Sequence, residues 1–130
     1  MVKYRNSSFD NEYGHWDSKL EYYRYLVLLD AQRRGVIRNI ERQVRFELIP
    51  EQREKVTLQR ITKRGVTYRT RERVVEHSCC YDADFVYEKD GRTVIEDTKG
   101  YHTKDYIIKR KLMRLQGNPI REVRTPNETV

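Results

Sequence analysis

Residues 81–100 constrain the fold of this chain more than any other segment. They read YDADFVYEKDGRTVIEDTKG, with runs of β-branched and aromatic residues on both sides of Asp90-Gly91. Asp-Gly between two such runs is the strongest short-range signal for a tight β-hairpin. The segment therefore predicts two antiparallel strands joined by a two-residue turn.

The alternation of side chains along these strands brings two acids and a lysine together. Successive side chains point to opposite faces of a strand, so Asp97 and Lys99 lie on one side. We expect Asp84, on the neighbouring strand, to face them. Two carboxylates can hold a Mg²⁺ ion that also contacts phosphate, and an ammonium group beside them can orient a water molecule. With the backbone carbonyl of Thr98 as a third candidate ligand, these residues predict phosphodiester hydrolysis.

The competing interpretation is an ion-pair cluster on the surface of the hairpin. Charged residues make up 36% of the chain, so an Asp-x-Lys triplet alone is a weak motif. Two features favour a site. Val94 and Ile95 make the second strand apolar before Asp97, and Gly100 suits a close approach of the backbone to a ligand. Glu96 should face the other way and is given no role as a metal ligand.

The charge balance of the chain indicates a polyanionic partner. The 130 residues include 27 Lys and Arg against 20 Asp and Glu, a formal net charge of +7. This excess favours nucleic acid as the partner, with an anionic membrane surface second. No apolar run approaches the ~18 residues of a membrane span, and residues 1–19 lack the apolar core of a signal peptide. We therefore expect a cytoplasmic protein without a membrane partner.

Apolar periodicity predicts two helices. The first spans residues 16–34, with Asp17 or Ser18 as N-cap and Gly35 after its last turn. The second spans residues 103–116. Spacings of three and four predict the buried faces, which are Leu20, Tyr23, Val27 and Ala31 in the first helix and Ile108, Leu112 and Leu115 in the second.

Strands account for most of the remaining chain. Residues 36–48 alternate polar and apolar side chains, and residues 120–123 form a last short strand. Residues 51–73 carry eight Lys or Arg against three Glu and are interpreted as an irregular hairpin with a basic tip. The order helix, strand, basic hairpin, two strands, helix, strand predicts a single α/β domain, with helices on a central mixed sheet.

Two basic clusters flank the carboxylates and are the expected DNA-contacting surfaces, because acids alone would repel phosphates. One is the hairpin and the other is the second helix. The alternative for each is a solvated charged face. The residues are Arg60, Lys63, Arg64, Arg69, Arg71 and Arg73 in the hairpin, and Lys104, Lys109 and Arg110 in the helix.

The acidic pattern has a family resemblance. Asp84, followed at a distance by Asp97-Thr98-Lys99, resembles the signature of PD-(D/E)xK nucleases, which share the restriction-endonuclease-like fold. The segments SKLEYYRYL, QVRFEL, ADFVYEKDG and VIEDTKG occur in the order of that fold's core elements. Ala83 precedes Asp84 where the signature has proline, a residue that is often missing in such families.

This resemblance implies a domain organisation and two further site residues. The nuclease domain would span residues 16–124, with residues 1–15 as a flexible N-terminal segment and 125–130 as a C-terminal tail. Family members often add an acid from the first helix as a metal ligand, a place that Glu21 occupies. Gln43 stands where a polar residue can touch water or metal in this fold; the alternative is a solvated strand face.

The resemblance also implies an activity. It suggests a Mg²⁺-dependent DNA endonuclease in which Mn²⁺ substitutes, with no small-molecule cofactor. It further suggests a phage-encoded protein acting in a bacterial host on branched or recombining DNA, as Holliday junction resolvases do, or as a nickase. Cutting two symmetric strands would require a homodimer. The rival hypotheses are a non-catalytic DNA-binding module and a nuclease subunit of a recombination or transposition machine.

Overall fold

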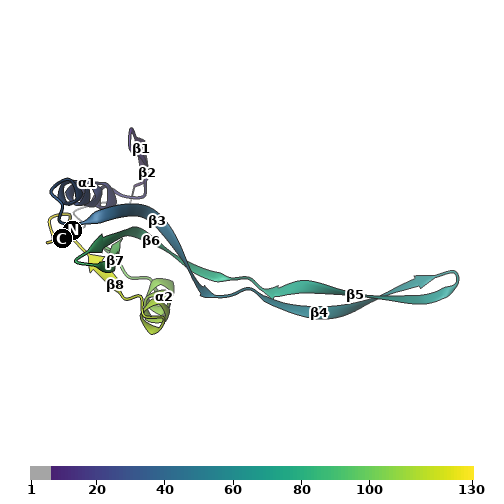
Figure 1. The fold of residues 1–130 in the computed structure, drawn as a ribbon. Coiled ribbons are helices and arrows are strands. Elements are labelled where there is room, and N and C mark those ends of the chain that lie inside the picture. Colours follow the sequence, from purple (N-terminus) through teal and green to yellow (C-terminus); the bar gives the residue numbers. More distant parts are fainter. Residues whose placement is uncertain (1–6) are drawn as a thin grey trace. The chain divides into compact units, whose positions relative to one another are not determined.

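The computed structural model describes residues 7–130, which divide into two compact units (Figure 1). The body comprises the chain up to Phe46 together with Asp82–Val130, and the second unit, here called the ribbon unit, comprises Glu47–Tyr81. The ribbon unit contains the basic hairpin that the sequence predicts within the α/β domain.

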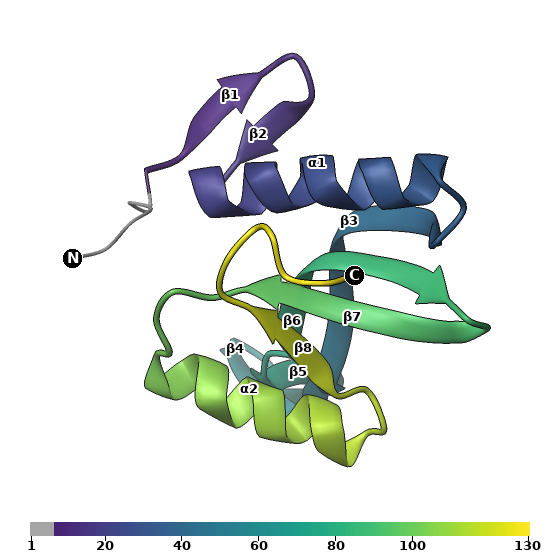
Figure 2. The ribbon, with the colours of Figure 1, turned by 90° about the vertical axis from the view of Figure 1, so that its left-hand side faces the viewer.

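The body is an α/β arrangement around a mixed sheet, as the sequence predicts. Its four strands lie in the order β3-β6-β7-β8, with β6 antiparallel to β7 and β7 parallel to β8. Helices α1 and α2 lie on opposite sides of this sheet, and α2 makes the crossover from β7 to β8 (Figure 2). The bounds are α1 Lys19–Arg33, β3 Arg38–Ile49, β6 Cys79–Lys89, β7 Arg92–Thr98, α2 Lys104–Leu115 and β8 Ile120–Val123.

The turn between β6 and β7 confirms the hairpin predicted from Asp-Gly. Asp90 has φ 51° and Gly91 has φ 74°. Positive φ at both central residues is the hallmark of a type I′ turn, whose twist matches that of the flanking strands. Pairing runs from Lys89 opposite Arg92 to Phe85 opposite Glu96.

Helix α1 begins at Lys19, three residues after the predicted start, and buries a partly different face. Ser18 is its N-cap, and the Ser18 hydroxyl accepts a hydrogen bond from the Glu21 backbone N–H at 3.2 Å. The predicted face is wrong in two places, because Tyr23 is exposed and Val27 is only half-buried. The buried residues of the helix are Leu20, Glu21, Arg24, Leu28 and Ala31. Two of these, Glu21 and Arg24, are charged. A prediction based on the spacing of apolar residues misses charged side chains that are buried with a partner.

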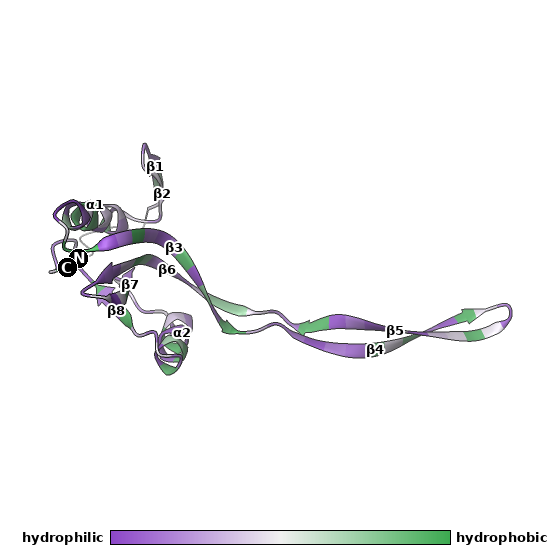
Figure 3. Ribbon diagram, in the orientation of Figure 1, coloured by the Kyte–Doolittle hydropathy of each residue, from purple (hydrophilic) through white to green (hydrophobic). Residues whose placement is uncertain are grey.

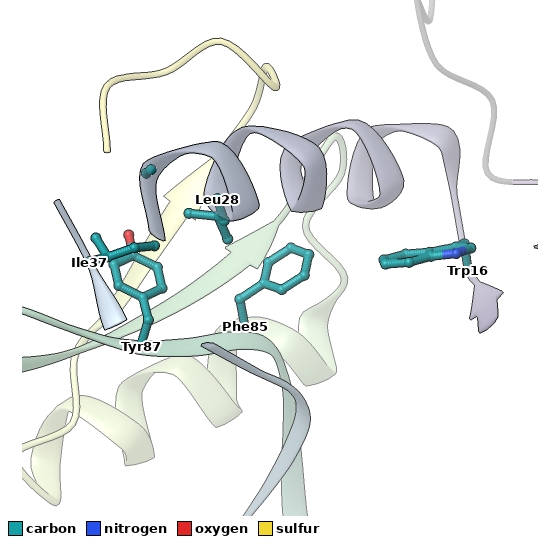
Figure 4. Packing of buried hydrophobic residues seen from close by; sticks show 6 residues of the cluster. Trp16, Leu28, Ile37, Phe85 and Tyr87 are labelled. Carbon is teal, nitrogen blue, oxygen red and sulfur yellow. The ribbon is translucent and has the colours of Figure 1, made fainter. Parts of the chain in front are cut away.

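The main core lies between α1 and the sheet. Figure 4 shows Leu28 of α1 directed toward Phe85 and Tyr87 of β6, with Trp16 packed near the start of the helix. The Tyr25 ring stacks on Phe85, with ring centroids 6.0 Å apart. Phe85 and Tyr87 have the same parity on β6, so one face of that strand meets α1.

A buried ion pair fixes α1 to the sheet. The guanidinium of Arg24 donates to both carboxylate oxygens of Glu96, at 2.8 and 2.9 Å, and both side chains are fully buried. The Tyr87 hydroxyl also donates to Glu96. Arg24 donates in addition to the backbone carbonyl of Pro126 at 3.1 Å, so residues of the C-terminal segment are bound to α1. Glu96 faces α1 and thus points away from Asp97, as alternation requires.

Helix α2 also contradicts its predicted buried face. Thr103 caps the helix, and the buried residues are Tyr106 and Met113. Ile108 and Leu115 are instead exposed, at 58% and 84%. Ile108 and Leu115 do lie on one side of α2, but the helix packs on the sheet through a neighbouring side, which carries Tyr106 and Met113.

The N-terminal part of the body forms a small hairpin. Residues 1–6 of the segment interpreted as flexible lie outside the described residues. Beyond them, β1 (Phe9–Asn11) pairs with β2 (Gly14–Trp16). The Trp16 indole N–H donates to the Asn11 side chain at 2.9 Å. Within residues 7–130, no helix is long and apolar enough to cross a membrane.

The ribbon unit is built around two antiparallel strands, β4 (Gln52–Thr62) and β5 (Gly65–Glu76). They are joined at Lys63-Arg64, so the predicted hairpin and its basic tip are confirmed. The register is regular from Arg53 to the turn, with one shift at Gln52. Figure 3 shows hydrophilic stretches along the ribbon, with hydrophobic residues near the turn. Nearly all of its side chains are exposed.

Candidate active site

Glu21, Gln43 and Asp84 converge in the body from three different elements. The Gln43 side-chain amide on β3 donates to Glu21 Oε1 of α1 at 2.8 Å. The same nitrogen lies 3.3 Å from Asp84 Oδ1 of β6. One amide group therefore bridges two of the carboxylates that the sequence analysis assigned to a common site.

The backbone at Gln43 is unusual. Its φ of 51° lies in the left-handed region, which is uncommon for a residue other than glycine. Holding a residue in this conformation costs of order 1 kcal/mol. Exposure along β3 nevertheless alternates through Gln43, which lies on the same face as Arg45, and the Gln43 amide reaches α1 and β6. Residues in this conformation concentrate at functional sites.

Asp84 and Asp97 share one face of the β6–β7 hairpin. Continuing the register one step beyond the Phe85–Glu96 pair sets Asp84 opposite Asp97, and opposed residues of an antiparallel pair point the same way. Asp84 Oδ2 accepts hydrogen bonds from the Thr98 backbone N–H at 2.8 Å and from the Thr98 hydroxyl at 2.7 Å. Thr98, expected to offer its carbonyl to a metal, thus also orients the Asp84 carboxylate.

Asp97 and Lys99 form an ion pair at the end of β7. Lys99 Nζ lies 3.4 Å from Asp97 Oδ1; the Asp97 side chain is buried and that of Lys99 is 27% exposed. The Lys99 backbone N–H donates to the Val123 carbonyl of β8 at 2.9 Å, which extends the parallel pairing past the strand end. The structure therefore brings the predicted acid and ammonium together and leaves the ammonium open to solvent.

Tyr106 is a site residue that sequence reasoning missed. Lys99 Nζ lies 4.3 Å from the centroid of its ring, a cation–π contact. Burial, followed by the negative charge of Asp97, raises the pKa of Tyr106 above its ordinary value. The His102 ring stacks on the Tyr106 ring, with centroids 5.5 Å apart. The only sequence signal was an aromatic residue in the first turn of a helix that follows Lys99.

Glu122 of β8 contacts two side chains beside Tyr106, His102 and Arg110. His102 Nε2 hydrogen-bonds one carboxylate oxygen of Glu122, and Arg110 donates to the other at 2.8 Å. Burial alone would raise the pKa of Glu122, but the hydrogen bonds from Arg110 and His102 outweigh it and hold the pKa below its usual range. His102 is therefore engaged by a carboxylate of β8.

Glu21 is the most perturbed acid of the group. Burial and then the negative charge of Asp84 raise its pKa from 4.5 to about 7. The hydrogen bonds from the Asp17 backbone N–H, at 3.1 Å, and from Gln43 act in the opposite direction. Arg42 lies 3.7 Å from Glu21 Oε1, while its guanidinium stacks on the Trp16 ring at 3.4 Å. Glu21 is thus held where a further positive charge would stabilise its ionised form.

The donor set consists of oxygen atoms. Among residues 7–130 no three His, Cys, Asp or Glu side chains are grouped closely enough to hold a metal ion by themselves. Mg²⁺ does not require such a cage, because it keeps several waters and binds through one or two carboxylates together with substrate phosphates. The pair Asp84 and Asp97, with Glu21 nearby, is chemically suited to that mode of binding.

The predicted DNA-contacting residues lie in both units. In the ribbon, every one of the six predicted basic residues is exposed, and Arg73 pairs with Glu54 at 3.0 Å. On α2, Lys104 is exposed and Lys109 half-buried, while Arg110 is engaged by Glu122. The ribbon therefore offers more cations to a partner than α2 does.

Comparison with known families places the chain. A family model described as "Protein of unknown function (DUF1064)" matches residues 1–127. The chain belongs to this family. The DUF1064 match includes the residues of the candidate site and the whole ribbon. Searches of curated proteins and of solved structures give no significant match.

Proposed function

We propose that this DUF1064 protein is a metal-dependent DNA endonuclease whose active site contains Asp84, Asp97, Lys99 and Glu21. The observation that carries the proposal is the Asp97–Lys99 pair, 3.4 Å apart, on the face of the hairpin that also carries Asp84. Paired carboxylates beside a solvent-accessible ammonium are the groups that phosphodiester hydrolysis requires. We also propose, from the resemblance described above, that the protein is a PD-(D/E)xK nuclease with the restriction-endonuclease-like fold.

A divalent cation fits the donor chemistry. Asp84 and Asp97 would hold it, with the Thr98 carbonyl and Glu21 as further oxygen donors. Bound Mg²⁺, or Mn²⁺ in its place, supplies Lewis-acid polarisation of the phosphate and stabilises the charge on the leaving oxygen. Burial, and after it the negative charge of Asp84, raises the pKa of Glu21, and a cation bound between the two acids would stabilise the ionised form of Glu21.

The side chains around these acids have separate roles. Lys99 orients the attacking water and neutralises negative charge that develops at the phosphate. Tyr106 restricts the position of the Lys99 ammonium through the ring contact at 4.3 Å. Gln43 holds Glu21 and directs its amide toward Asp84. Thr98 fixes the orientation of the Asp84 carboxylate through two hydrogen bonds.

DNA is the proposed substrate because the chain carries a formal net charge of +7 and exposes many arginines on the ribbon. Following the resemblance, we propose branched or recombining DNA as the preferred form, in a phage-encoded protein acting in the bacterial cytoplasm. One active site cuts one strand at a time, so paired cuts would be made by a homodimer.

The test is a cleavage assay with Mg²⁺ on duplex, flap, single-stranded and four-way DNA. Asp97→Asn and Lys99→Ala should each lower the cleavage rate by at least about 100-fold while leaving DNA affinity nearly intact, because phosphate contacts elsewhere supply the binding energy. Asp82→Asn is the matched control. Asp82 lies on the strand of Asp84 but is engaged by Arg45 at 2.9 Å, and its loss should leave the rate within about threefold of the wild type.

A non-catalytic DNA-binding module is the second candidate. The observation that favours it is the same ion pair, since Asp97 and Lys99 neutralise each other and such a pair also serves structure. DNA binding without cleavage of any of the four substrates, with Mg²⁺ or Mn²⁺ present, would establish this candidate and reject the nuclease. Cleavage that persists in both variants would move the active site elsewhere.

A further inference from the structure

The register of the ribbon sorts its side chains into two chemically different faces. Residues directly opposite each other in an antiparallel pair point to the same side, and successive pairs alternate. The first face carries the pairs Glu54–Arg73, Val56–Arg71, Leu58–Arg69 and Arg60–Thr67. The second carries Arg53–Val74, Lys55–Glu72, Thr57–Thr70, Gln59–Tyr68 and Ile61–Val66. We call the first the arginine face and the second the tyrosine face.

Positive charge is greater on the arginine face. It holds four arginines against one acid, Glu54, which pairs with Arg73 at 3.0 Å. The tyrosine face holds one arginine and one lysine against one glutamate, and its arginine, Arg53, is engaged by Glu51 at 2.7 Å. A basic composition by itself would not separate the charges in this way, since a merely solvated ribbon exposes both faces to water equally.

The spacing of the arginines suits a regular polyanion. Arg69, Arg71 and Arg73 occupy alternate positions of one strand, about 6.8 Å apart, because a strand rises about 3.4 Å per residue. Each strand of duplex DNA presents one phosphate per 3.4 Å of helix axis. Val56 and Leu58 lie opposite Arg71 and Arg69 on the other strand and add apolar side chains to the face, which can contact thymine methyl groups.

We infer that the arginine face of the ribbon binds in the major groove of duplex DNA, with the tyrosine face turned away from the DNA. The major groove admits a two-stranded β-ribbon, and arginine is the side chain that pairs with guanine edges there. The major groove of A-form RNA is too narrow for side chains to enter, which makes DNA the expected partner. The inference rests on the proposed function only in taking DNA as the substrate.

The experiment measures binding of the full-length protein to a short duplex in EDTA, so that cleavage plays no part. Arg71→Gln and Lys55→Gln form a matched pair. They each remove one exposed positive charge, and they lie in neighbouring cross-strand pairs on opposite faces. We expect Arg71→Gln to weaken binding about fivefold and to reduce the slope of log affinity against log salt by roughly one unit. Lys55→Gln should change affinity less than twofold.

The groove is tested with a duplex whose cytosines carry glucosylated hydroxymethyl groups, which fill the major groove. The wild type should bind it at least about tenfold more weakly than plain duplex. A variant with Arg69→Lys and Arg71→Lys keeps both charges, so it should keep the salt slope and lose most of this difference. Lysine preserves the charge and suits the strand geometry, so this variant is expected to fold, and its binding can be compared directly with that of the wild type.

Three results would overturn the inference. One is an equal loss of affinity from Arg71→Gln and Lys55→Gln, which would mean that the faces are equivalent. Another is unchanged binding to the glucosylated duplex, which would place the contact on the backbone or in the minor groove. The third is binding to double-stranded RNA as tight as to DNA. Each is separate from a failure of the proposed function, which would appear as intact binding without cleavage.

Discussion

The side-chain amide of Gln43 donates a hydrogen bond to Glu21 at 2.8 Å, and it does so from a left-handed backbone conformation. The contact joins Glu21, on the buried face of α1, to β3, which is the edge strand of the sheet. It also sets the charge of Glu21, because a hydrogen bond to a carboxylate favours the ionised form. Two predictions follow from the titration of this acid.

The first concerns the pH dependence of cleavage. If Glu21 must be ionised to bind the metal, activity should rise with pH through about 7, the raised pKa of Glu21. Gln43→Ala removes a hydrogen bond that lowers this pKa, so the rise should move to higher pH by about one unit. The matched variant is Gln43→Gly, which also lacks the amide but accepts the left-handed backbone. Both should shift the profile equally, while glycine should be the more stable by about 1 kcal/mol. A profile unmoved in both would separate Gln43 from the titration of Glu21.

The second concerns stability without metal. Because the pKa of Glu21 is raised from 4.5 to about 7 on folding, the folded state binds the extra proton between these values. Its favourable contribution is complete below about pH 4.5 and is lost as pH rises through 7, by up to about 3 kcal/mol. Urea unfolding in EDTA at pH 5 and pH 8 measures it. Glu21→Gln should reduce the pH dependence by that amount, and Mg²⁺ should raise the wild-type melting temperature more at pH 8. Parallel curves for the two proteins would contradict the assigned shift.

The third concerns Tyr106 as a positioning residue for Lys99. Tyr106→Leu removes the aromatic ring that lies 4.3 Å from the ammonium and should lower kcat about tenfold with little change in KM. Tyr106→Phe keeps the ring and should restore kcat to within about threefold. Single-turnover cleavage at saturating protein measures both. Equal activity of the leucine and phenylalanine variants would show that the ring contact does not act on Lys99.

The fourth concerns the buried pair of Arg24 and Glu96. Glu96→Gln leaves the fully buried Arg24 without its counter-charge, which should lower the free energy of unfolding by about 3 kcal/mol. The comparison is Glu88→Gln, which breaks the exposed pair with Arg38 at 2.8 Å and should leave the unfolding midpoint nearly unchanged. Well below the melting temperature, both variants should cleave DNA at the wild-type rate. A large loss of cleavage in folded Glu96→Gln would assign Glu96 to the site.

The hairpin with its acids could be predicted because the information is local. Asp90-Gly91 fixes the turn and thereby the register, and the register alone sets Asp84 opposite Asp97. Lys99 follows from alternation. From α1 onward, the order of helices and strands was likewise readable from periodicity, and so was the crossover helix between the last two strands, whereas the hairpin of β1 and β2 was not predicted.

The features that could not be predicted from the sequence depend on contacts between residues that are distant in the chain. Arg24 is buried because Glu96, 72 residues later, neutralises it, and no periodic pattern marks such a residue as core. Helix α2 has two stripes that sequence reasoning could bury, and the sheet selects the one with Tyr106 and Met113. The reach of Gln43 to Glu21 depends on one backbone torsion that no residue type in the segment announces.

The ribbon has a consequence for the timing of recognition. Its side chains are nearly all exposed, so its strands are held by ladder hydrogen bonds and cross-strand pairs with little buried apolar surface. A lone two-stranded hairpin of this kind is marginally stable in water. Its backbone amides should therefore exchange with deuterium far faster than those of β6 and β7. Binding would then slow that exchange, and part of the interaction energy would be spent on ordering the strands, which favours rapid release over tight retention.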